Sequence, residues 1–91
     1  MNRTIILLWL LLIVVPVGNT GSVHHCHKYY DGSHVTVKYG HIDADNYIDY
    51  AYVSSFHMES TDTYDFSWSA TTVSIFIYRN GSPVASKTCY G

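Results

Sequence analysis

From residue 23 onward, apolar and polar residues alternate in short runs that are separated by glycine, asparagine or aspartate. Successive side chains of a β-strand point to opposite faces, so this alternation is typical of strands with one buried face. β-Branched and aromatic residues dominate the runs, which also favours strands. Residues 54–63 are ambiguous and fit either an extension of the third strand or a bulge. The pattern predicts six strands, at residues 23–30, 34–39, 47–53, 64–69, 72–78 and 83–89.

Two dipeptides between the predicted strands favour tight hairpin turns. Asp31-Gly32 separates the first two strands, and Asn80-Gly81 separates the last two. Residues of these types tolerate the positive φ angles that a type I′ turn needs. Pro83 falls at the start of the last strand, where its missing N–H is harmless. Short antiparallel strands at this regular spacing predict an all-β fold, either a six-stranded antiparallel β-sandwich or a small barrel.

The start of the chain has a different pattern. Arg3 precedes an unbroken run of eleven apolar residues, Ile5 to Val15, and Pro16 and small residues follow. Such a run is too short to span a bilayer but matches the core of a secretion signal. We therefore expect residues 1–21 to be a cleaved signal peptide, with a retained membrane anchor as the alternative. Residues 22–91 are then one secreted domain with no membrane partner.

Charge and cysteine content limit the functions and the stabilising bonds that are expected of this domain. Without residues 1–21 the chain keeps four Lys and Arg against seven Asp and Glu, a formal net charge of −3 with neutral histidines. Nucleic-acid binding needs a basic surface, so we expect no nucleic-acid partner. A domain this small buries little apolar surface and is usually stabilised by an additional cross-link, such as a disulfide or a bound metal ion. We expect Cys26 and Cys89 to form one disulfide in an oxidising secretory route.

Histidines surround Cys26, at positions 24, 25, 27 and 34, which raises the question of a metal site. A structural zinc ion needs four convergent ligands. Strand alternation places His25 and His27 on one face, and His24 and Cys26 on the other. His25, His27 and His34 are therefore the candidate metal ligands, although a disulfide would remove the Cys26 thiolate. The alternative is a group of polar aromatic neighbours without a metal, and we expect no cofactor.

Other candidate functional residues point to binding rather than catalysis. Serine, histidine and aspartate are plentiful, but no motif fixes a catalytic triad, so we expect no enzyme and no catalytic residues. The nine tyrosines exceed what so small a core can hold, and tyrosine is enriched at binding surfaces. The alternative is that they simply cover a thin sandwich whose surface is partly aromatic. The second predicted strand is a candidate edge that could accept a partner strand. Its residues are His34, Val35, Thr36, Val37, Lys38 and Tyr39.

A family resemblance adds to this picture. Cys26 followed by Tyr-Tyr-Asp-Gly at residues 29–32, and the segment IFIYRNGSPV at residues 75–84 ahead of Cys89, resemble the MAX effectors. These Magnaporthe avirulence and ToxB-like proteins are secreted by plant-pathogenic fungi, chiefly the rice blast fungus. The resemblance covers the layout of residues 22–91. It implies two three-stranded antiparallel sheets packed face to face, with strands one, two and six in one sheet, and no catalysis.

The resemblance also implies a role and a set of partners. Family members bind host plant proteins, among them small heavy-metal-associated domains and immune receptors. Most rice-blast members place the second cysteine before the last strand, whereas Cys89 lies at the extreme end, as in the ToxB-like members. This departure leaves the host target open. We expect a monomeric virulence effector that is extracellular or translocated into the host cytoplasm. The alternatives are a secreted antimicrobial or cytotoxic toxin and a histidine-based metal-binding protein.

Overall fold

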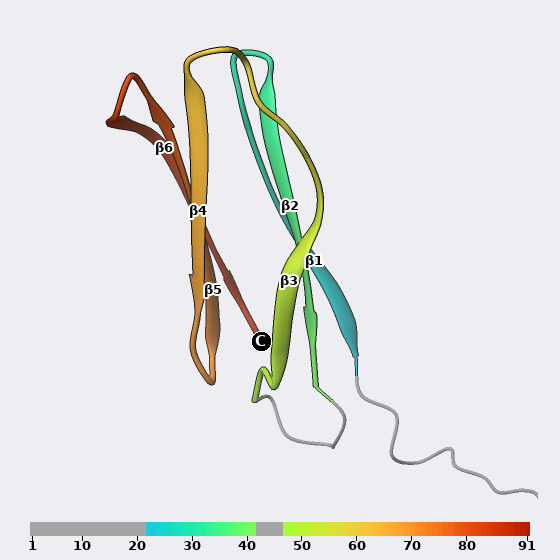
Figure 1. The fold of residues 1–91 in the computed structure, drawn as a ribbon. Helices are drawn as coiled ribbons and strands as arrows, with labels where there is room; N and C mark the ends of the chain where they lie inside the picture. The colour runs from blue at the N-terminus through green and yellow to red at the C-terminus, as the bar shows by residue number, and fades with distance from the viewer. Residues whose placement is uncertain (1–21, 42–46) are drawn as a thin grey trace, which may run out of the picture.

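The chain forms six antiparallel strands in two sheets. Its structure, a computed structural model, describes residues 22–41 and 47–91, so the predicted signal peptide lies outside the described residues. The strands are β1 (Val23–Tyr30), β2 (Ser33–Gly40), β3 (Tyr50–His57), β4 (Asp62–Trp68), β5 (Thr72–Arg79) and β6 (Ser82–Tyr90). One sheet has the order β1-β2-β3 and the other the order β4-β5-β6 (Figure 1). The described part of the chain contains no helix that could cross a bilayer.

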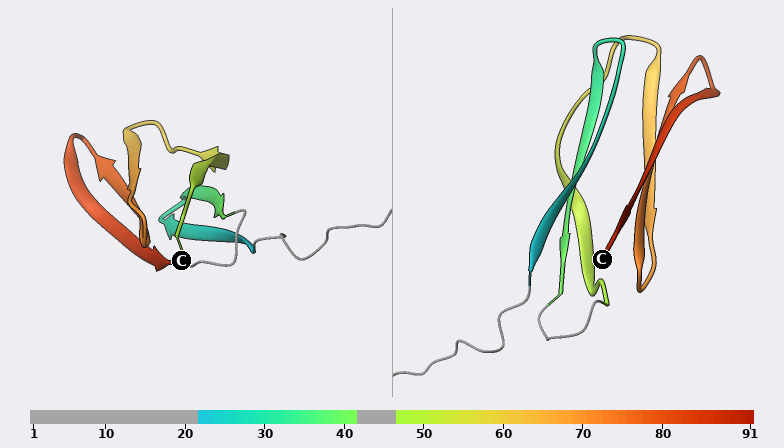
Figure 2. Two further views of the ribbon diagram at one scale, coloured as in Figure 1. Left: turned by 90° about the horizontal axis from the view of Figure 1, so that it is seen from below. Right: turned by 180° about the vertical axis from the view of Figure 1, so that it is seen from behind.

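This architecture confirms the predicted all-β fold of two three-stranded sheets. The two sheets face each other, as the views from below and from behind show (Figure 2). One implication of the family resemblance is wrong, because β6 pairs with β5 and not with β1. Every hydrogen-bonded neighbour in the two sheets is also the next strand along the chain. Each pair therefore consists of two strands that follow one another directly in the sequence.

The two predicted hairpin turns are confirmed by their backbone angles. Asp31 and Gly32 have φ angles of 43° and 92°, and Asn80 and Gly81 have φ angles of 54° and 79°. Positive φ at both central residues is the signature of a type I′ turn, whose twist matches that of the flanking strands. The Asp31-Gly32 turn therefore sets the register of the whole β1–β2 hairpin. The Asn80-Gly81 turn sets the β5–β6 register only next to the turn, because that register shifts between Ile77 and Tyr78.

The third strand differs most from its prediction. It begins at Tyr50 instead of residue 47, because the Ile48 N–H donates to the Ala70 carbonyl at 2.7 Å and leaves the ladder. It then runs on to His57, through part of the ambiguous segment. Its register with β2 shifts next to Thr36, and this irregularity leaves residue 54 unpaired. The predicted bulge and the predicted extension of this strand are thus both present.

The core lies between the two sheets. Alternate residues of each strand point inward, as the strand period of two requires. All of the fully buried apolar side chains except Cys26 come from the two central strands, β2 and β5. The whole core consists of Cys26, Val35, Val37, Tyr39, Ile48, Val73, Ile75 and Ile77. Because this core is small, other contacts must hold the two sheets together.

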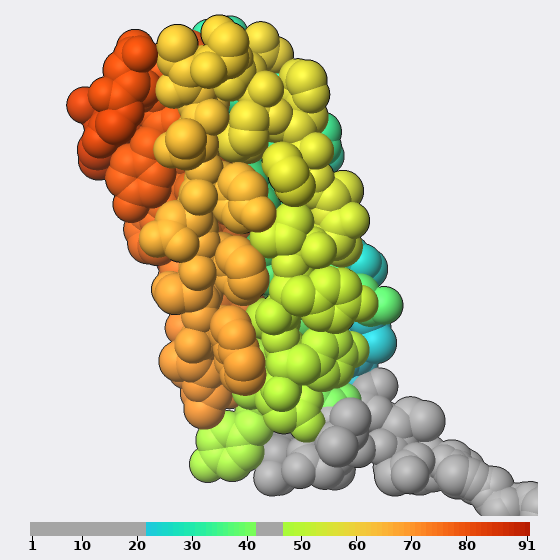
Figure 3. All heavy atoms as spheres, viewed as in Figure 1, coloured from blue at the N-terminus to red at the C-terminus, as the bar shows by residue number. Residues whose placement is uncertain are grey.

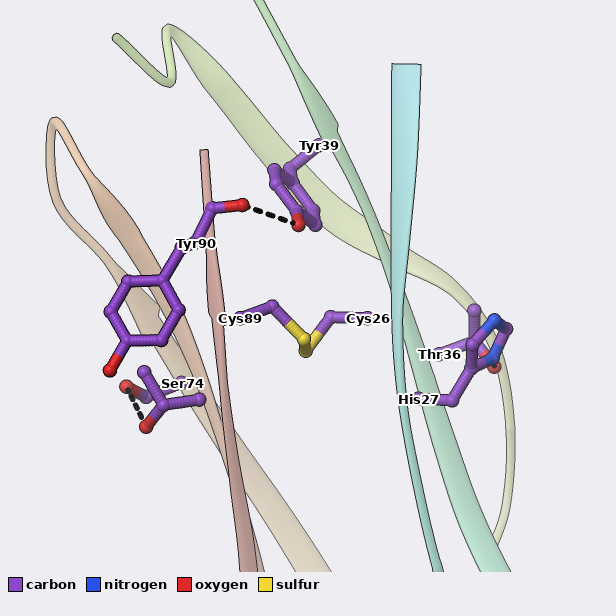
Figure 4. Close-up of a disulfide and its surroundings, with 8 residues drawn as sticks. Cys26, His27, Thr36, Tyr39, Ser74, Cys89 and Tyr90 are labelled. Carbon is purple, nitrogen blue, oxygen red and sulfur yellow. Dashed lines mark hydrogen bonds between the residues drawn. A yellow bond between two sulfur atoms is a disulfide. The ribbon is translucent and has the colours of Figure 1, made fainter. Parts of the chain in front are cut away.

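The first of these contacts is a disulfide between β1 and β6. The Sγ atoms of Cys26 and Cys89 are 2.07 Å apart, so the predicted bond is confirmed (Figure 4). Cys26 is fully buried, and the bond crosses from one sheet to the other at the centre of the fold. The Tyr39 hydroxyl donates to the Tyr90 carbonyl at 3.2 Å beside it. These contacts replace the backbone pairing that β1 and β6 lack.

The second contact between the sheets is an ionic network centred on Arg79, which we call the Arg79 network. Arg79 Nε and Nη2 donate to the two carboxylate oxygens of Asp62 at 2.7 and 2.8 Å. Its Nη1 donates to Asp31 Oδ2 at 2.6 Å, and its guanidinium lies over the ring of Tyr30. The Ser33 hydroxyl, from the other sheet, also donates to Asp62 at 2.6 Å. The network therefore joins β4 and β5 to the β1–β2 hairpin.

The network changes the acidity of its central carboxylate. Hydrogen bonds from Arg79 and then from Ser33 lower the pKa of Asp62 from 3.8 to about 2. Hydrogen bonds to Asp62 and Asp31 raise the pKa of Arg79 above its ordinary value. Because the folded protein holds the Asp62 proton less tightly than the unfolded chain does, the carboxylate contributes stability above the unfolded pKa. That contribution is lost as the pH falls through about 2.

We expect the disulfide to be the largest single contribution to stability. Replacing both cysteines by serine should lower the free energy of unfolding by roughly 4 kcal/mol, because the bond closes a long loop in the unfolded chain. Urea unfolding followed by tryptophan fluorescence measures this difference. An unchanged unfolding midpoint would show that the two sheets hold together without the bond.

We also expect a pH dependence that Asp62 carries. The wild-type melting temperature should fall as the pH is lowered from about 4 to about 2. Asp62→Asn should lower the melting temperature at pH 7, because the arginine loses its charged partner, and should flatten this acid slope. Asp65→Asn, on an exposed position of the same strand, is the matched control. Equal acid slopes in the wild type and Asp62→Asn would contradict the assignment.

Candidate functional site

The outward face of the β1–β2–β3 sheet gathers histidine and tyrosine side chains, and we call it the histidine–tyrosine face. Cross-strand pairing places His25 opposite Lys38, His27 opposite Thr36, and Tyr29 opposite His34. On the other side of β2, His34 is opposite His57, and Lys38 is opposite Tyr52. The face comprises His25, His27, Tyr29, His34, Thr36, Lys38, Tyr50, Tyr52, Ser55 and His57. Figure 4 shows His27 and Thr36 on the opposite side of the sheet from the disulfide.

Five rings of this face form a continuous row. Along β1, the ring centroids of His25 and His27 are 6.1 Å apart, and those of His27 and Tyr29 are 6.5 Å apart. The row then crosses the sheet through His34, 5.4 Å from Tyr29, to His57, a further 6.2 Å away. Neighbouring ring planes are within 28° of parallel. The rings therefore stand side by side and present edges, rather than flat faces, to the solvent.

A second aromatic group lies on the same face. Tyr50 and Tyr52 stack with a centroid separation of 6.2 Å, and the Lys38 ammonium lies 5.9 Å from the centre of the Tyr52 ring. Tyr50 also covers Gly40, where a Cβ atom would come within 2.7 Å of the tyrosine hydroxyl. An aromatic ring over a strand glycine protects the backbone that the glycine exposes. Gly40 therefore helps to fix the position of this tyrosine pair.

Polar contacts hold several of these rings in place. His27 Nδ1 and the Thr36 hydroxyl are 3.1 Å apart, and Thr36 is only 6% exposed although it lies on the outward face. The surrounding rings thus cover the centre of the sheet. His57 Nε2 is 3.3 Å from Glu59 Oε2, and both side chains are exposed. A buried threonine hydroxyl is not presented to a substrate, so its contact with histidine does not form a nucleophile site.

The three predicted metal ligands all lie on the histidine–tyrosine face. His25 and His27 are neighbours on β1, as predicted, but Tyr29 separates them from His34 in the row. In residues 22–41 and 47–91, no group of three or more His, Cys, Asp or Glu side chains is placed to hold a metal ion. Cys26 is committed to the disulfide.

The prediction that residues 34–39 are an exposed edge strand is wrong. They belong to β2, the central strand of its sheet, which pairs with β1 on one side and with β3 on the other. Its backbone groups therefore face two neighbours, and a partner strand cannot be added there. Val35, Val37 and Tyr39 point into the core. The alternate residues His34, Thr36 and Lys38 lie on the histidine–tyrosine face, so half of the predicted set remains a candidate for partner binding.

The two remaining histidines lie apart from the row. His24 shares the inner side of β1 with Cys26, and its ring stacks on the buried Tyr39 at 5.3 Å. His41 is buried, 6.4 Å from His24 between ring centroids. The six histidines of the chain thus divide into four on an exposed face and two that pack inward.

Other surface features are less organised. Phe56 and Trp68 are exposed on β3 and β4, and Phe56 contacts the Tyr64 ring at 5.1 Å across the open side of the sandwich. Figure 3 shows the side chains of β3 and β4 meeting along this side. A shallow depression next to the β5–β6 hairpin is lined by Phe76, Pro83, Val84, Ala85 and Ser86. It is too open to enclose a small ligand as a typical binding pocket does.

Sequence patterns identified only part of the face. The alternation along residues 23–30 correctly separated His25 and His27 from His24 and Cys26. Tyr29 on β1 was not singled out as a site residue, and neither were the four β3 members of the face, Tyr50, Tyr52, Ser55 and His57. The signal of the β3 members was present as alternation in residues 50–57, but the bulge at residue 54 breaks that alternation in the middle.

Comparisons of the chain with family models, with curated proteins and with solved structures found no match.

We expect the histidine–tyrosine face to be dispensable for folding. His25→Gln should change the free energy of unfolding by less than about 0.5 kcal/mol, as is usual for surface substitutions. Ile75→Ala, in the core, should cost about 2–5 kcal/mol. Urea unfolding compares the two variants. A loss of stability in His25→Gln as large as that in Ile75→Ala would show that the row is a structural element.

Proposed function

We propose that the protein is a secreted, non-catalytic effector of the MAX type from a plant-pathogenic fungus, and that it acts by binding a host plant protein. The observation that carries the proposal is the gathering of histidine and tyrosine on one exposed face of a small, disulfide-stapled domain. Tyrosine supplies a large, rigid contact area at low entropic cost and is enriched at protein interfaces. The disulfide is compatible with an oxidising extracellular compartment.

Within this proposal, the histidine–tyrosine face replaces the second strand's edge as the contact surface. Tyr29 and Tyr52 are the leading contact residues, because they are 65% and 48% exposed and lie on different edges of the face. His34 and Lys38, from β2, lie between them. A heavy-metal-associated domain or an immune receptor remains the proposed partner class, on the family resemblance alone.

We expect binding to a plant partner to depend on these tyrosines. The protein, secreted from the full-length chain, would be used to capture partners from host leaf extract, and each candidate partner would then be purified and titrated. The double substitution Tyr29→Ala and Tyr52→Ala should weaken binding at least tenfold, because tyrosine is among the residues whose truncation at an interface commonly costs above about 1 kcal/mol each. Thr63→Ala and Ser67→Ala, on the exposed side of β4, are the matched control.

Two results would contradict the proposal. One is a purified partner whose affinity is unchanged in the double tyrosine variant, which would place the contact elsewhere. The other is growth inhibition of bacteria or fungi by the pure protein with no plant present, which would favour the antimicrobial alternative.

A further inference from the structure

The histidine–tyrosine face has an unequal distribution of charged and titratable groups. Its basic and titratable members are the four histidines of the row and Lys38, together with the phenols of Tyr29, Tyr50 and Tyr52. Glu59, beside His57, places a carboxylate against a ring of this face. Asp49 stands at the far end, next to Gly40.

The other described carboxylates belong to the Arg79 network or lie on the other sheet. Asp31 and Asp62 belong to the Arg79 network. Asp65 lies on an outward position of β4, in the other sheet. Lys28 occupies an inward position of β1, so it does not contribute to this face. When its histidines take up protons, the face therefore becomes strongly cationic while the rest of the domain keeps its acids.

We propose that the histidine–tyrosine face binds an extended acidic segment of a partner protein, and that this binding is tighter at acidic than at neutral pH. The inference rests on the proposed function, since it names the chemistry of the partner and the regulation of the same face. Histidine is the side chain whose charge ordinarily changes between pH 5 and pH 8, and this face gathers four histidines.

The spacing of the row identifies the shape of the acidic segment. The ring centroids of His25, His27 and Tyr29 follow one another at 6.1 and 6.5 Å. In an extended peptide, alternate side chains on one face repeat at roughly 6.6 Å. Acidic residues at every second position of an extended segment therefore meet successive rings of β1. The segment lies on the face of the sheet and pairs with no strand edge.

The orientation of the rings suits carboxylates. Because neighbouring rings stand side by side, they present edges outward, and the polar edge of a protonated imidazole carries N–H donors. Nδ1 of His27 lies within hydrogen-bond distance of the Thr36 hydroxyl. This contact uses one of the two ring nitrogens, and the other is Nε2. Neighbouring imidazolium groups at these separations repel each other, and an anionic segment laid along the row offsets that repulsion.

The experiment uses the secreted protein and a labelled peptide with four Glu-Ser repeats, titrated by fluorescence anisotropy at low salt. Binding should be about tenfold or more tighter at pH 5.5 than at pH 7.5, as several weak ion pairs together would give. A peptide with four Gln-Ser repeats should not bind at either pH. Added salt should weaken binding to the acidic peptide, because exposed charges are screened.

Histidine variants locate the effect on the molecule. The double substitution His25→Gln and His27→Gln should remove most of the pH dependence. His24→Gln, a neighbour on the inward side of β1, is the matched control and should leave it unchanged. A melting curve for each variant confirms that it is folded. Affinity for the acidic peptide that is equal at both pH values, or equally reduced in His24→Gln, would overturn the inference.

The same measurements separate this inference from the proposed function. If the acidic peptide fails to bind but a plant partner still depends on Tyr29 and Tyr52, the inference is wrong and the proposed function stands. If the acidic peptide binds as expected but no plant protein does, the face is an acid-binding surface and the proposed host target is wrong.

Discussion

The disulfide between Cys26 and Cys89 is the constraint on which the rest of the structure depends. The two sheets share no hydrogen-bonded strand pair, so the contacts between them are mainly those of side chains, with isolated backbone bonds such as Ile48 N–H to the Ala70 carbonyl. A sandwich of this size buries few apolar residues, and the burial of those residues alone stabilises the fold only marginally. By joining β1 to β6 through the core, the bond sets which faces of the two sheets turn inward.

The Arg79 network adds a second, directional tie. It links the β1–β2 hairpin to β4 and β5, where the guanidinium, two carboxylates and a serine hydroxyl satisfy one another. Asp62 is 5% exposed, and a buried carboxylate is tolerated only when its charge is paired and hydrogen-bonded. The disulfide and the network together hold the sheets at two separate places. A rigid scaffold of this kind can present a flat face without an enclosed pocket.

Once the inward faces are fixed, the composition of the outward faces follows. The period of two in β1 sends Cys26 to the core and, in doing so, sends His25 and His27 to the solvent. The same constraint on β2 buries Val35 and Val37 and exposes the residues between them. The histidine–tyrosine face is therefore a consequence of core formation, and its chemistry is available for binding because no described strand packs over it.

Local features of the sequence determined the strands, the two type I′ turns and the division of β1 into two faces, because φ preferences and side-chain alternation act between neighbours. Residues 22–91 contain two cysteines, so only one intramolecular disulfide is possible. The order of strands in the sheets was decided only by tertiary structure. Residues 34–39 were predicted to be an edge strand, but they form the central strand of their sheet. The last strand pairs with the fifth strand and not with the first. The meeting of His34 with His57, and of Arg79 with Asp62, likewise depends on contacts between distant segments, whose free energy is set by the packing of the whole chain.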